Sequence, residues 1–367
     1  MSRFQSEKLR HLTPYTPGEQ PRDMQYTKLN TNESPFPPSQ KAIAAATEAA
    51  KKLQLYSDPT CRALCERLAE IYGVEPDEVI VTNGSDEVLD FAFQAFCDDY
   101  TPAVFADITY GFYPVFAERN GIGYCTVALK DDFTIDIEDY FDFVDSRYFE
   151  GPKIPSSCMI VIANPNAPTG IALSRDEIEQ IIIHNPDSVV VVDEAYVEFG
   201  GESCVPLVKK YDNLLVTQTF SKSRSLAGGR LGFGIGCKSL IADLQTVRYS
   251  TNPYNVNSMT LAAGLGVLAD EDYTHRNCQT IIENRAWTTE QLVSRNFTVL
   301  DSKTNFVFAK HASVSGEYIY TELKSRGVLV RHFTSERICD YNRITIGSKE
   351  QMMTLIKTID EVLAEKA

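Results

Sequence analysis

Runs of consecutive apolar residues alternate with helical patterns through the middle of the chain. Continuous runs of β-branched residues indicate strands buried on both faces, because a strand with one exposed face would alternate apolar and polar positions. Helical spacing follows several of them, as in residues 85–96 and 176–184. The pattern predicts a mainly parallel α/β sheet covered by helices. The predicted strands lie in "EVIVT", "CMIVIA", "SVVVVD", "NLLVTQT" and "GRLGFGIG".

The pattern differs towards both ends of the chain. Residues 39–53 and 58–73 predict helices, with Ser39 as an N-cap and Gly73 as a stop signal. Residues 257–295 predict one long helical stretch, and shorter mixed segments follow it. We therefore expect three parts: an N-terminal arm with part of a small domain (1–50), a large α/β domain (51–253) and a small C-terminal α+β domain (254–367).

Charge and composition narrow the classes of partner. The 367 residues carry a formal net charge of −15, which argues against a nucleic acid or an anionic membrane as the main partner. No apolar run is long enough to span a membrane, and the first twenty residues lack the apolar core of a secretory signal. The expected partners are therefore small molecules.

The nine cysteines do not predict a disulfide framework or a metal site. Their number is odd and their spacing is scattered. Cys61 and Cys65 lie one helical turn apart, but a metal site would need two more ligands nearby, so packing is the favoured interpretation. We expect no metal and a reducing, cytoplasmic location.

Polar residues gather where the predicted strands end, which is where open α/β sheets bind ligands. Taken singly, a Gly-Ser turn is usually structural, a strand-end carboxylate can cap a helix, and a lysine is more often a salt-bridge partner than a nucleophile. Together they include an anion-binding turn at a helix N-terminus, a buried acid, a lysine and an arginine. That combination suits a phosphorylated aldehyde cofactor, and pyridoxal phosphate fits it.

The motifs that carry these residues resemble those of a known family. In order they are "YSDP", "NGSDE", "TYGFY", "NPNAPTG", "VDEAYVEF", "TFSKSRSLAGGRLGF", "NPYNVN" and "RITIG". The chain resembles the fold type I pyridoxal-phosphate enzymes of the aspartate-aminotransferase superfamily and, more narrowly, the histidinol-phosphate aminotransferases. The resemblance covers nearly the whole length. It implies pyridoxal 5′-phosphate as cofactor and a homodimer with active sites at its interface.

The resemblance also implies which residues bind the cofactor. Lys222 matches the lysine that forms the Schiff base and later moves the proton, and Asp193 matches the acid that pairs with the pyridine nitrogen. Tyr196 matches the phenol that bonds the ring oxygen. Many relatives have asparagine at the position of Ala167. Asn166 is therefore a candidate ligand only if its loop adopts a conformation that directs its side chain to the cofactor. The remaining matches are Tyr110 on the ring face, Gly84, Ser85, Asp86, Thr219, Ser221 and Arg230 around the phosphate, and Tyr56 from the partner subunit.

The substrate residues implied by the resemblance are Arg343, Arg331 and Asn32. A guanidinium suits both phosphate and carboxylate, so Arg343 could bind histidinol phosphate in one half-reaction and glutamate in the other. We expect ping-pong transamination of histidinol phosphate and 2-oxoglutarate, as in histidine biosynthesis. An aromatic-amino-acid aminotransferase and a threonine-phosphate decarboxylase remain open. A cofactor-binding regulatory module without catalysis is disfavoured because the chain has no basic, DNA-binding extension.

Overall fold

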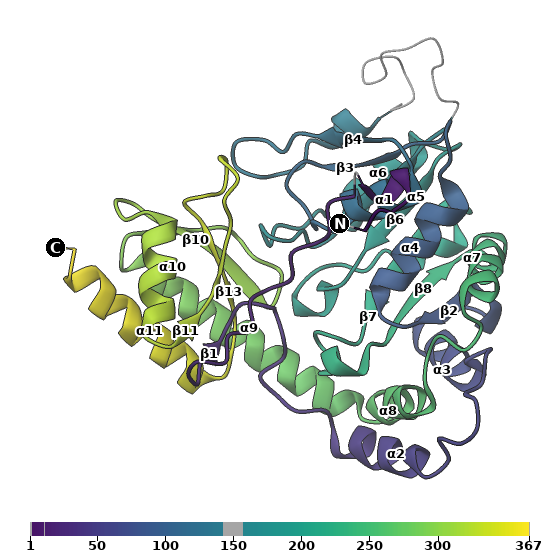
Figure 1. Ribbon diagram of the computed structural model, residues 1–367, viewed down its shortest axis with the longest axis horizontal. Helices are drawn as coiled ribbons and strands as arrows, with labels where there is room; N and C mark the ends of the chain where they lie inside the picture. Colours follow the sequence, from purple (N-terminus) through teal and green to yellow (C-terminus); the bar gives the residue numbers. More distant parts are fainter. Residues whose placement is uncertain (1, 11, 142–156, 367) are drawn as a thin grey trace.

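The computed structural model describes residues 2–10, 12–141 and 157–366. Its centre is a seven-stranded sheet with the strand order β2-β8-β7-β6-β5-β3-β4 (Figure 1). Every strand in it runs parallel to its neighbours except β8, which is antiparallel to both β2 and β7. The strands are β2 (Val79–Thr82), β3 (Ala103–Ala106), β4 (Tyr124–Val127), β5 (Met159–Ala163), β6 (Val189–Asp193), β7 (Leu214–Thr219) and β8 (Gly232–Gly236).

Helices cover both faces of this sheet, which explains the continuous apolar strands. One face packs against α4 (Ser85–Phe96), α5 (Tyr113–Asn120) and α7 (Lys238–Thr251). The other packs against α3 (Arg62–Tyr72), α6 (Arg175–Ile183) and α8 (Ser258–Leu268). Successive residues of β6 point to opposite faces, so Val191 joins the first cluster while Val190 and Val192 join the second. The predicted α/β architecture is confirmed.

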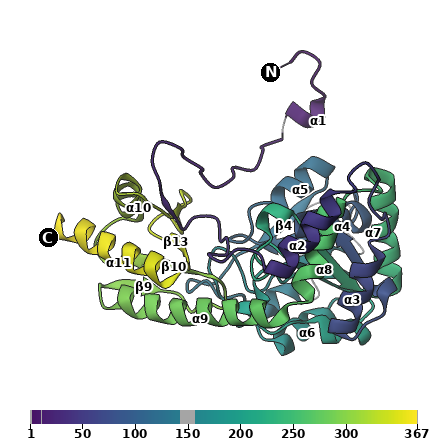
Figure 2. The same ribbon diagram turned by 90° about the horizontal axis from the view of Figure 1, so that it is seen from below.

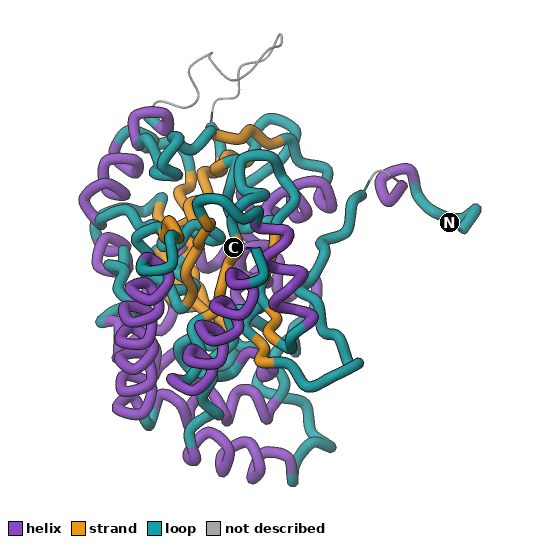
Figure 3. Tube along the Cα trace, turned by 90° about the vertical axis from the view of Figure 1, so that its left-hand side faces the viewer, coloured by secondary structure: helices purple, strands orange, loops and turns teal. Residues whose placement is uncertain are grey.

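A smaller group of elements lies beside the large sheet (Figure 1). It has an antiparallel sheet of order β12-β13-β10-β9 and a parallel pair formed by β1 and β11. Because β1 belongs to the N-terminal arm, this part of the arm joins the small sheet, whereas α1 (Glu7–Arg10) extends away from the body (Figures 2 and 3). The elements are β1 (Thr27–Lys28), β9 (Phe297–Val299), β10 (Phe306–His311), β11 (Val328–Leu329), β12 (Arg331–His332), β13 (Asn342–Thr345), α9 (Glu271–Val293), α10 (Gly316–Ser325) and α11 (Lys349–Ala364).

The prediction of one long helix over residues 257–295 is wrong. The segment forms two helices, α8 and α9, and Asp270 begins α9 in a non-helical conformation. The helix α8 lies against α2 (Gln40–Ala50), and a Cβ added at Gly266 would come within 2.6 Å of the Ala42 Cα atom. The helical spacing could not reveal this break, because α8 packs on α2 and on the large sheet while α9 packs on the small one. The three-domain division stays a prediction, and its boundary at residue 253 falls between α7 and α8.

Two further details of the sequence prediction are confirmed. The Ser39 side chain accepts a hydrogen bond from the Ala42 amide and caps α2, and Gly73 ends α3 with a φ of 67°. Between the elements lie short 3-10 turns at Pro76–Glu78, Ile137–Tyr140, Val197–Phe199, Val205–Lys209 and Ala227–Gly229. Within the described ranges, no helix combines the length and the apolar character that crossing a membrane requires.

The sheet brings the strand-end loops together. Strands β5, β6 and β7 are adjacent and parallel, so the residues that follow them leave the sheet at one edge. The Pro/Asn-rich loop at 164–170, the turn at 193–196 and the glycine-rich segment that starts at Thr219 therefore lie side by side. This edge faces the small sheet, and the N-terminal arm passes between the two (Figure 1).

Candidate active site

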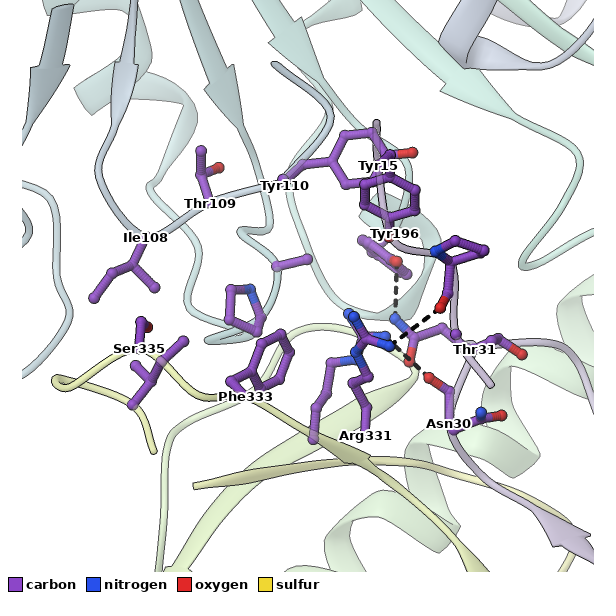
Figure 4. Close-up of a pocket in the computed structure, with 18 of the residues that line it drawn as sticks. Tyr15, Asn30, Thr31, Ile108, Thr109, Tyr110, Tyr196, Arg331, Phe333 and Ser335 are labelled. Atoms are coloured by element: carbon purple, nitrogen blue, oxygen red, sulfur yellow. Dashed lines mark hydrogen bonds between the residues drawn. The ribbon is translucent and has the colours of Figure 1, made fainter. Parts of the chain in front are cut away.

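A cavity of about 450 Å³ lies where the strand-end loops, the small sheet and the N-terminal arm meet. Aromatic rings of Tyr15, Tyr110 and Tyr196 gather at one end of it, whereas Ile108, Thr109 and Ser335 lie at the other (Figure 4). Among the residues predicted for the site, those that line the cavity are Asn32, Tyr110, Tyr196, Lys222, Arg331 and Arg343.

Lys222 projects into this cavity from the loop after β7. Its Nζ donates a hydrogen bond to the Thr31 carbonyl oxygen at 3.2 Å and lies 5.8 Å from the Tyr196 ring centre. Asn32 Nδ2 donates to the Tyr196 hydroxyl at 2.9 Å. Because that hydroxyl accepts from Asn32, its own proton is directed elsewhere and can be donated to a ligand. Asn32 itself is fixed, since its Oδ1 accepts from the Thr345 hydroxyl at 3.0 Å.

Asp193 ends β6 as a buried carboxylate. The Tyr113 hydroxyl of α5 donates to Asp193 Oδ2 at 2.9 Å, and the Ala195 amide donates to Oδ1 at 3.3 Å. Burial raises the pKa of Asp193 to about 6, although the Tyr113 hydrogen bond opposes this rise. The charge of Lys222 also lowers this pKa, but no ion pair among the described residues neutralises Asp193. Because a buried carboxylate without an ion-pair partner is costly, the position favours a cationic ligand atom.

An anion-binding cup lies beside the cavity at the start of α4. Gly84 occupies the N-cap with a φ of 87° and offers no side-chain cap to the first amides of the helix. Arg230 follows the glycine-rich turn, and a Cβ at position 84 would come within 2.6 Å of its Nη2 atom. The positive φ favours glycine at this position, and a larger residue would also displace the guanidinium.

Hydroxyl and carboxyl groups complete the cup. Arg230 Nη2 contacts Asp86 Oδ2 at 3.1 Å, and its Nη1 lies 3.5 Å from the Ser221 hydroxyl. The Thr219 hydroxyl in turn donates to Ser221 Oγ at 3.0 Å. A phosphate group requires donors of this kind: the Arg230 guanidinium, the Ser221 and Thr219 hydroxyls and the amides at the start of α4. The Asp86 carboxylate only accepts, and it holds the guanidinium in place. Thus the predicted phosphate ligands lie together, just outside the lining of the cavity.

Tyr110 connects the cup to the cavity. Its hydroxyl donates to Asp86 Oδ1 at 2.9 Å, and burial raises its pKa well above the ordinary value. The ring packs edge-on against Tyr113 at 5.5 Å and tilted against Tyr15 at 6.3 Å between centres. One aromatic wall therefore reaches from the anion cup to the mouth of the cavity, and Tyr113 links that wall to Asp193.

Two arginines of the small sheet close the opposite wall. Arg343 Nη2 donates to the Asn30 carbonyl oxygen at 3.1 Å, while its Nε is buried without a hydrogen-bond partner among the described residues. Burial lowers the pKa of this guanidinium. Arg331 donates to the carbonyl oxygens of Thr16 and Pro17, each at 3.4 Å. Two cations held mainly by neutral carbonyls form a strong anion site.

Besides Asp193 and the residues of the anion-binding cup, two predicted residues, Asn166 and Tyr56, do not line the cavity. The Asn166 amide is held by the segment after β3 and by its own loop. Its Oδ1 accepts from the Thr109 hydroxyl at 2.7 Å, and its Nδ2 donates to the Ile108 carbonyl and the Thr169 hydroxyl, each at 3.0 Å. Its neighbour Ala167 lines the cavity instead. Tyr56 stacks on Tyr254 with centres 4.6 Å apart and is 82% exposed.

Sequence reasoning missed much of the lining. Tyr15, Pro17 and Gly18 come from the arm, which carries no catalytic motif, and only its richness in Pro, Asn and Thr marked it as extended. The segment around Phe333 and Ser335 connects β12 to β13, and its length was the only available signal. The other missed lining residues are Asn30, Thr31, Asp107, Ile108, Thr109, Gly111, Pro168 and Ile338.

Known proteins share both the sequence and the fold. The pattern of the family "Aminotransferase class I and II" matches residues 25–359. A histidinol-phosphate aminotransferase of Brachyspira hyodysenteriae is 44% identical over 365 residues, with 99% of each chain covered. Histidinol-phosphate aminotransferase 1 of Bradyrhizobium diazoefficiens is 46% identical over 363 residues, with 99% of this chain and 100% of that one covered.

A solved structure has the same fold. The histidinol-phosphate aminotransferase of Sinorhizobium meliloti, in complex with pyridoxal 5′-phosphate, superimposes with a TM-score of 0.82. The two chains are 24% identical, and the comparison covers 93% of this chain and 91% of that one. At this identity the likeness concerns the fold.

Proposed function

This chain belongs to the class I and II aminotransferases, and we propose that it transfers the amine of histidinol phosphate to 2-oxoglutarate. The observation that carries the proposal is the pair Arg331 and Arg343, which face the cavity that also holds Lys222. A phosphate on the amino donor and a carboxylate on the acceptor are both oxyanions that a guanidinium binds. Two relatives that are 44% and 46% identical carry the name of this enzyme.

The enzyme is a pyridoxal-phosphate-dependent aminotransferase, and the residues present fit that cofactor. The donors around Gly84, Ser221 and Arg230 suit its phosphate, and the buried Asp193 carboxylate suits a protonated ring nitrogen. When bound, the cofactor supplies an electron sink for the bond that breaks at the substrate's amine-bearing carbon.

The chain's own groups then have separate tasks. The ε-amino group of Lys222 holds the cofactor and carries a proton to and from the substrate carbon. The Tyr196 hydroxyl accepts a hydrogen bond from Asn32 and would donate its own proton to the ring oxygen of the bound cofactor. Tyr110 provides an apolar face that keeps water from one side of the cavity. Asp193 keeps a proton on the ring nitrogen, because its buried charge is most stable beside a cation.

We further propose a homodimer in which Tyr56 reaches the site of the partner subunit. An 82% exposed tyrosine stacked on Tyr254 sits next to two exposed leucines, Leu53 at 54% and Leu55 at 64%. Exposed apolar side chains that gather in this way are typical of an interaction surface. Light scattering of wild-type protein and of a Leu55→Asp variant tests it, with a lower mass expected for the variant. An equal mass for the variant and the wild type would contradict the proposed surface.

We also infer a cytoplasmic location. None of the nine cysteines, all of which lie in the described ranges, forms a disulfide bond. Such cysteine usage suits a reducing compartment.

A spectral titration tests the substrate. Cofactor-loaded protein is mixed with histidinol phosphate, phenylalanine, glutamate or threonine phosphate, without keto acid, and the visible band of the cofactor is followed. We expect the band to disappear at the lowest concentration with histidinol phosphate and to return when 2-oxoglutarate is added. A stronger response to phenylalanine would favour an aromatic aminotransferase, and carbon dioxide release from threonine phosphate would favour a decarboxylase.

A further inference from the structure

A buried network of polar side chains lies directly behind the active-site loops. Glu194 follows Asp193 in the chain, and Arg224 lies two positions after Lys222. Gln218 lies in β7, just before that lysine's loop. Glu194 and Gln218 have exposed fractions of 0% and 1%. These side chains have no task in the reaction described above, yet each is within a few positions of a residue that has one.

The network is a directed chain of hydrogen bonds. Arg224 Nη2 donates to the Tyr72 hydroxyl at 3.1 Å. The Tyr72 hydroxyl donates to Gln218 Oε1 at 2.5 Å, and Gln218 Nε2 donates to Glu194 Oε2 at 2.7 Å. The Tyr72 hydroxyl accepts the first bond and donates the second, and the Gln218 amide accepts the second and donates the third. The bonds therefore polarise one another along the chain from the Arg224 cation to the Glu194 carboxylate. Arg224 therefore stabilises the buried Glu194 charge without touching it.

Both ends of the chain are anchored. Arg224 Nη1 forms an ion pair with Glu198 at 2.6 Å, in the turn that follows Tyr196. Glu194 accepts two more hydrogen bonds, from the Ser203 hydroxyl at 2.7 Å and from the Cys204 amide at 2.5 Å. Every partner of this carboxylate is a donor, which is the arrangement that an ionised carboxylate requires.

Resting on the proposed function, we propose that Arg224, Tyr72, Gln218 and Glu194 form a positioning relay for the active site. The relay fixes the loop that carries Lys222 relative to the turn that carries Asp193 and Tyr196. None of the four touches the cavity, and Glu194 points to the sheet face opposite Asp193, where it meets β7. They act through the backbone and through the negative charge that Glu194 adds behind the site.

The relay explains why a costly buried charge is kept. Misplacing a catalytic group by about 1 Å can reduce a rate by about a hundredfold. Besides the pairing of β6 with β7 and the Arg224–Glu198 ion pair, the relay holds the two loops in register. A relay of polar bonds selects one arrangement, because a shifted loop would leave a buried donor or acceptor unpaired.

The test uses cofactor-loaded, full-length Tyr72→Phe protein, with Tyr211→Phe as the control. Both changes remove only a hydroxyl, and Tyr211 donates to Glu179 at 2.7 Å, outside this network. The midpoint of the pH-dependent change in the visible cofactor band is measured, together with kcat and KM. We expect the midpoint to fall by about half a pH unit or more in Tyr72→Phe. Loss of the Tyr72 hydroxyl weakens the stabilisation of the Glu194 carboxylate, so a larger fraction of Glu194 is protonated and less negative charge remains behind the site to hold a proton on the lysine nitrogen.

We also expect kcat to fall about tenfold with KM for the amino donor nearly unchanged, and both readouts to stay at wild-type values in Tyr211→Phe. A wild-type midpoint and kcat in Tyr72→Phe would overturn the proposal, as would an equal response of the control. If Tyr72→Phe does not fold, Ser203→Ala decides, because it removes another donor to the same carboxylate at a partly exposed position. Its midpoint must then move in the same direction.

The substrate proposal and the relay proposal fail in different ways. The band midpoint is measured without substrate, so the relay is tested even if histidinol phosphate is not the amino donor. Should wild-type protein bind the cofactor but ignore histidinol phosphate, only the substrate assignment is lost.

Discussion

Arg331 and Arg343 stand directly opposite each other on the paired strands β12 and β13. Like charges at such a position destabilise a sheet by themselves. Here Arg343 lies 5.3 Å from the Phe306 ring centre, and both guanidiniums lie near the Phe333 ring, at 5.9 Å for Arg343 and 5.8 Å for Arg331. These contacts offset part of the repulsion, and a bound oxyanion would offset the rest.

The two arginines should therefore differ in their effect on the two substrates. We expect Arg343→Gln to raise KM for both histidinol phosphate and 2-oxoglutarate by roughly tenfold to a hundredfold, the loss expected for a charge-assisted hydrogen bond. Arg331→Gln should raise KM mainly for histidinol phosphate. Its phosphate carries more negative charge than a single carboxylate of 2-oxoglutarate, so it can bind both guanidiniums at once. Steady-state kinetics with each substrate varied in turn measures both, and Arg62→Gln at the surface serves as control. Equal effects of Arg331→Gln on the two substrates would contradict the assignment.

Lys222→Ala should abolish transamination. The variant lacks the only amino group that lines the cavity within the described part of the chain, so neither covalent retention of the cofactor nor proton transfer remains. The assay is steady-state turnover, with borohydride trapping of the cofactor as a second readout. Lys210→Ala, whose ammonium pairs with Glu179 at 2.5 Å far from the site, is the control. Turnover retained in Lys222→Ala would remove this residue from the mechanism.

Tyr113→Phe should raise the pKa of Asp193. The change removes the hydroxyl that donates to Asp193 Oδ2 and leaves the packing of the ring in place. We expect kcat to fall by about threefold to tenfold, the factor that a net hydrogen bond of about 1 kcal/mol represents. The acid limb of the kcat–pH profile should move to higher pH. Tyr124→Phe on the exposed edge strand β4 is the control, and an unshifted limb in Tyr113→Phe would count against the role of Asp193.

The cofactor-free protein should lose stability through its two buried carboxyls as the pH rises from about 4 to 7. Burial raises the pKa of Asp193 to about 6 and that of Glu194 to about 7, from ordinary values of 3.8 and 4.5. Between those values the folded state binds more protons than the unfolded state, so their contribution to the free energy of unfolding falls with rising pH.

Glu194→Gln isolates one of these contributions. Glu198 also raises the pKa of Glu194, whereas the Cys204 amide and the Ser203 and Gln218 side chains lower it. Urea unfolding at pH 5 and pH 8 should show a smaller loss of stability in the variant than in the wild type. An equal loss in the two proteins would mean that Glu194 is already ionised at pH 5.

Gly266→Ala should destabilise the protein although alanine favours helices by about 1 kcal/mol. The new Cβ would lie 2.6 Å from the Ala42 Cα and the Lys41 carbonyl oxygen, and backbone atoms cannot rotate away. We expect a net loss of about 2 kcal/mol or more in thermal or urea unfolding. Gly123→Ala, where nothing lies within 4 Å, should be neutral and is the control. A neutral Gly266→Ala would show that α2 and α8 separate easily.

The apolar runs of the sequence predict five of the seven strands of the large sheet and the loops that hold chemistry, whereas β3 and β4 were not predicted. Continuous apolar runs predict strands buried on both faces, and a lysine and a carboxylate at the ends of parallel strands are expected at the same edge of the sheet. The twelve positions between Arg331 and Arg343 are also compatible with two neighbouring strands.

Tertiary structure alone decided which side chains reach the cavity. Tyr15 comes from an arm without periodicity, and its position depends on the pairing of β1 with β11, which joins residues about three hundred positions apart. Asn166 and Ala167 are neighbours, yet the hydrogen bonds of Asn166 with Thr109 turn the amide inward and leave Ala167 at the cavity. Local patterns encode which face a residue takes within its own element, whereas the contacts between distant elements depend on packing that no single segment contains.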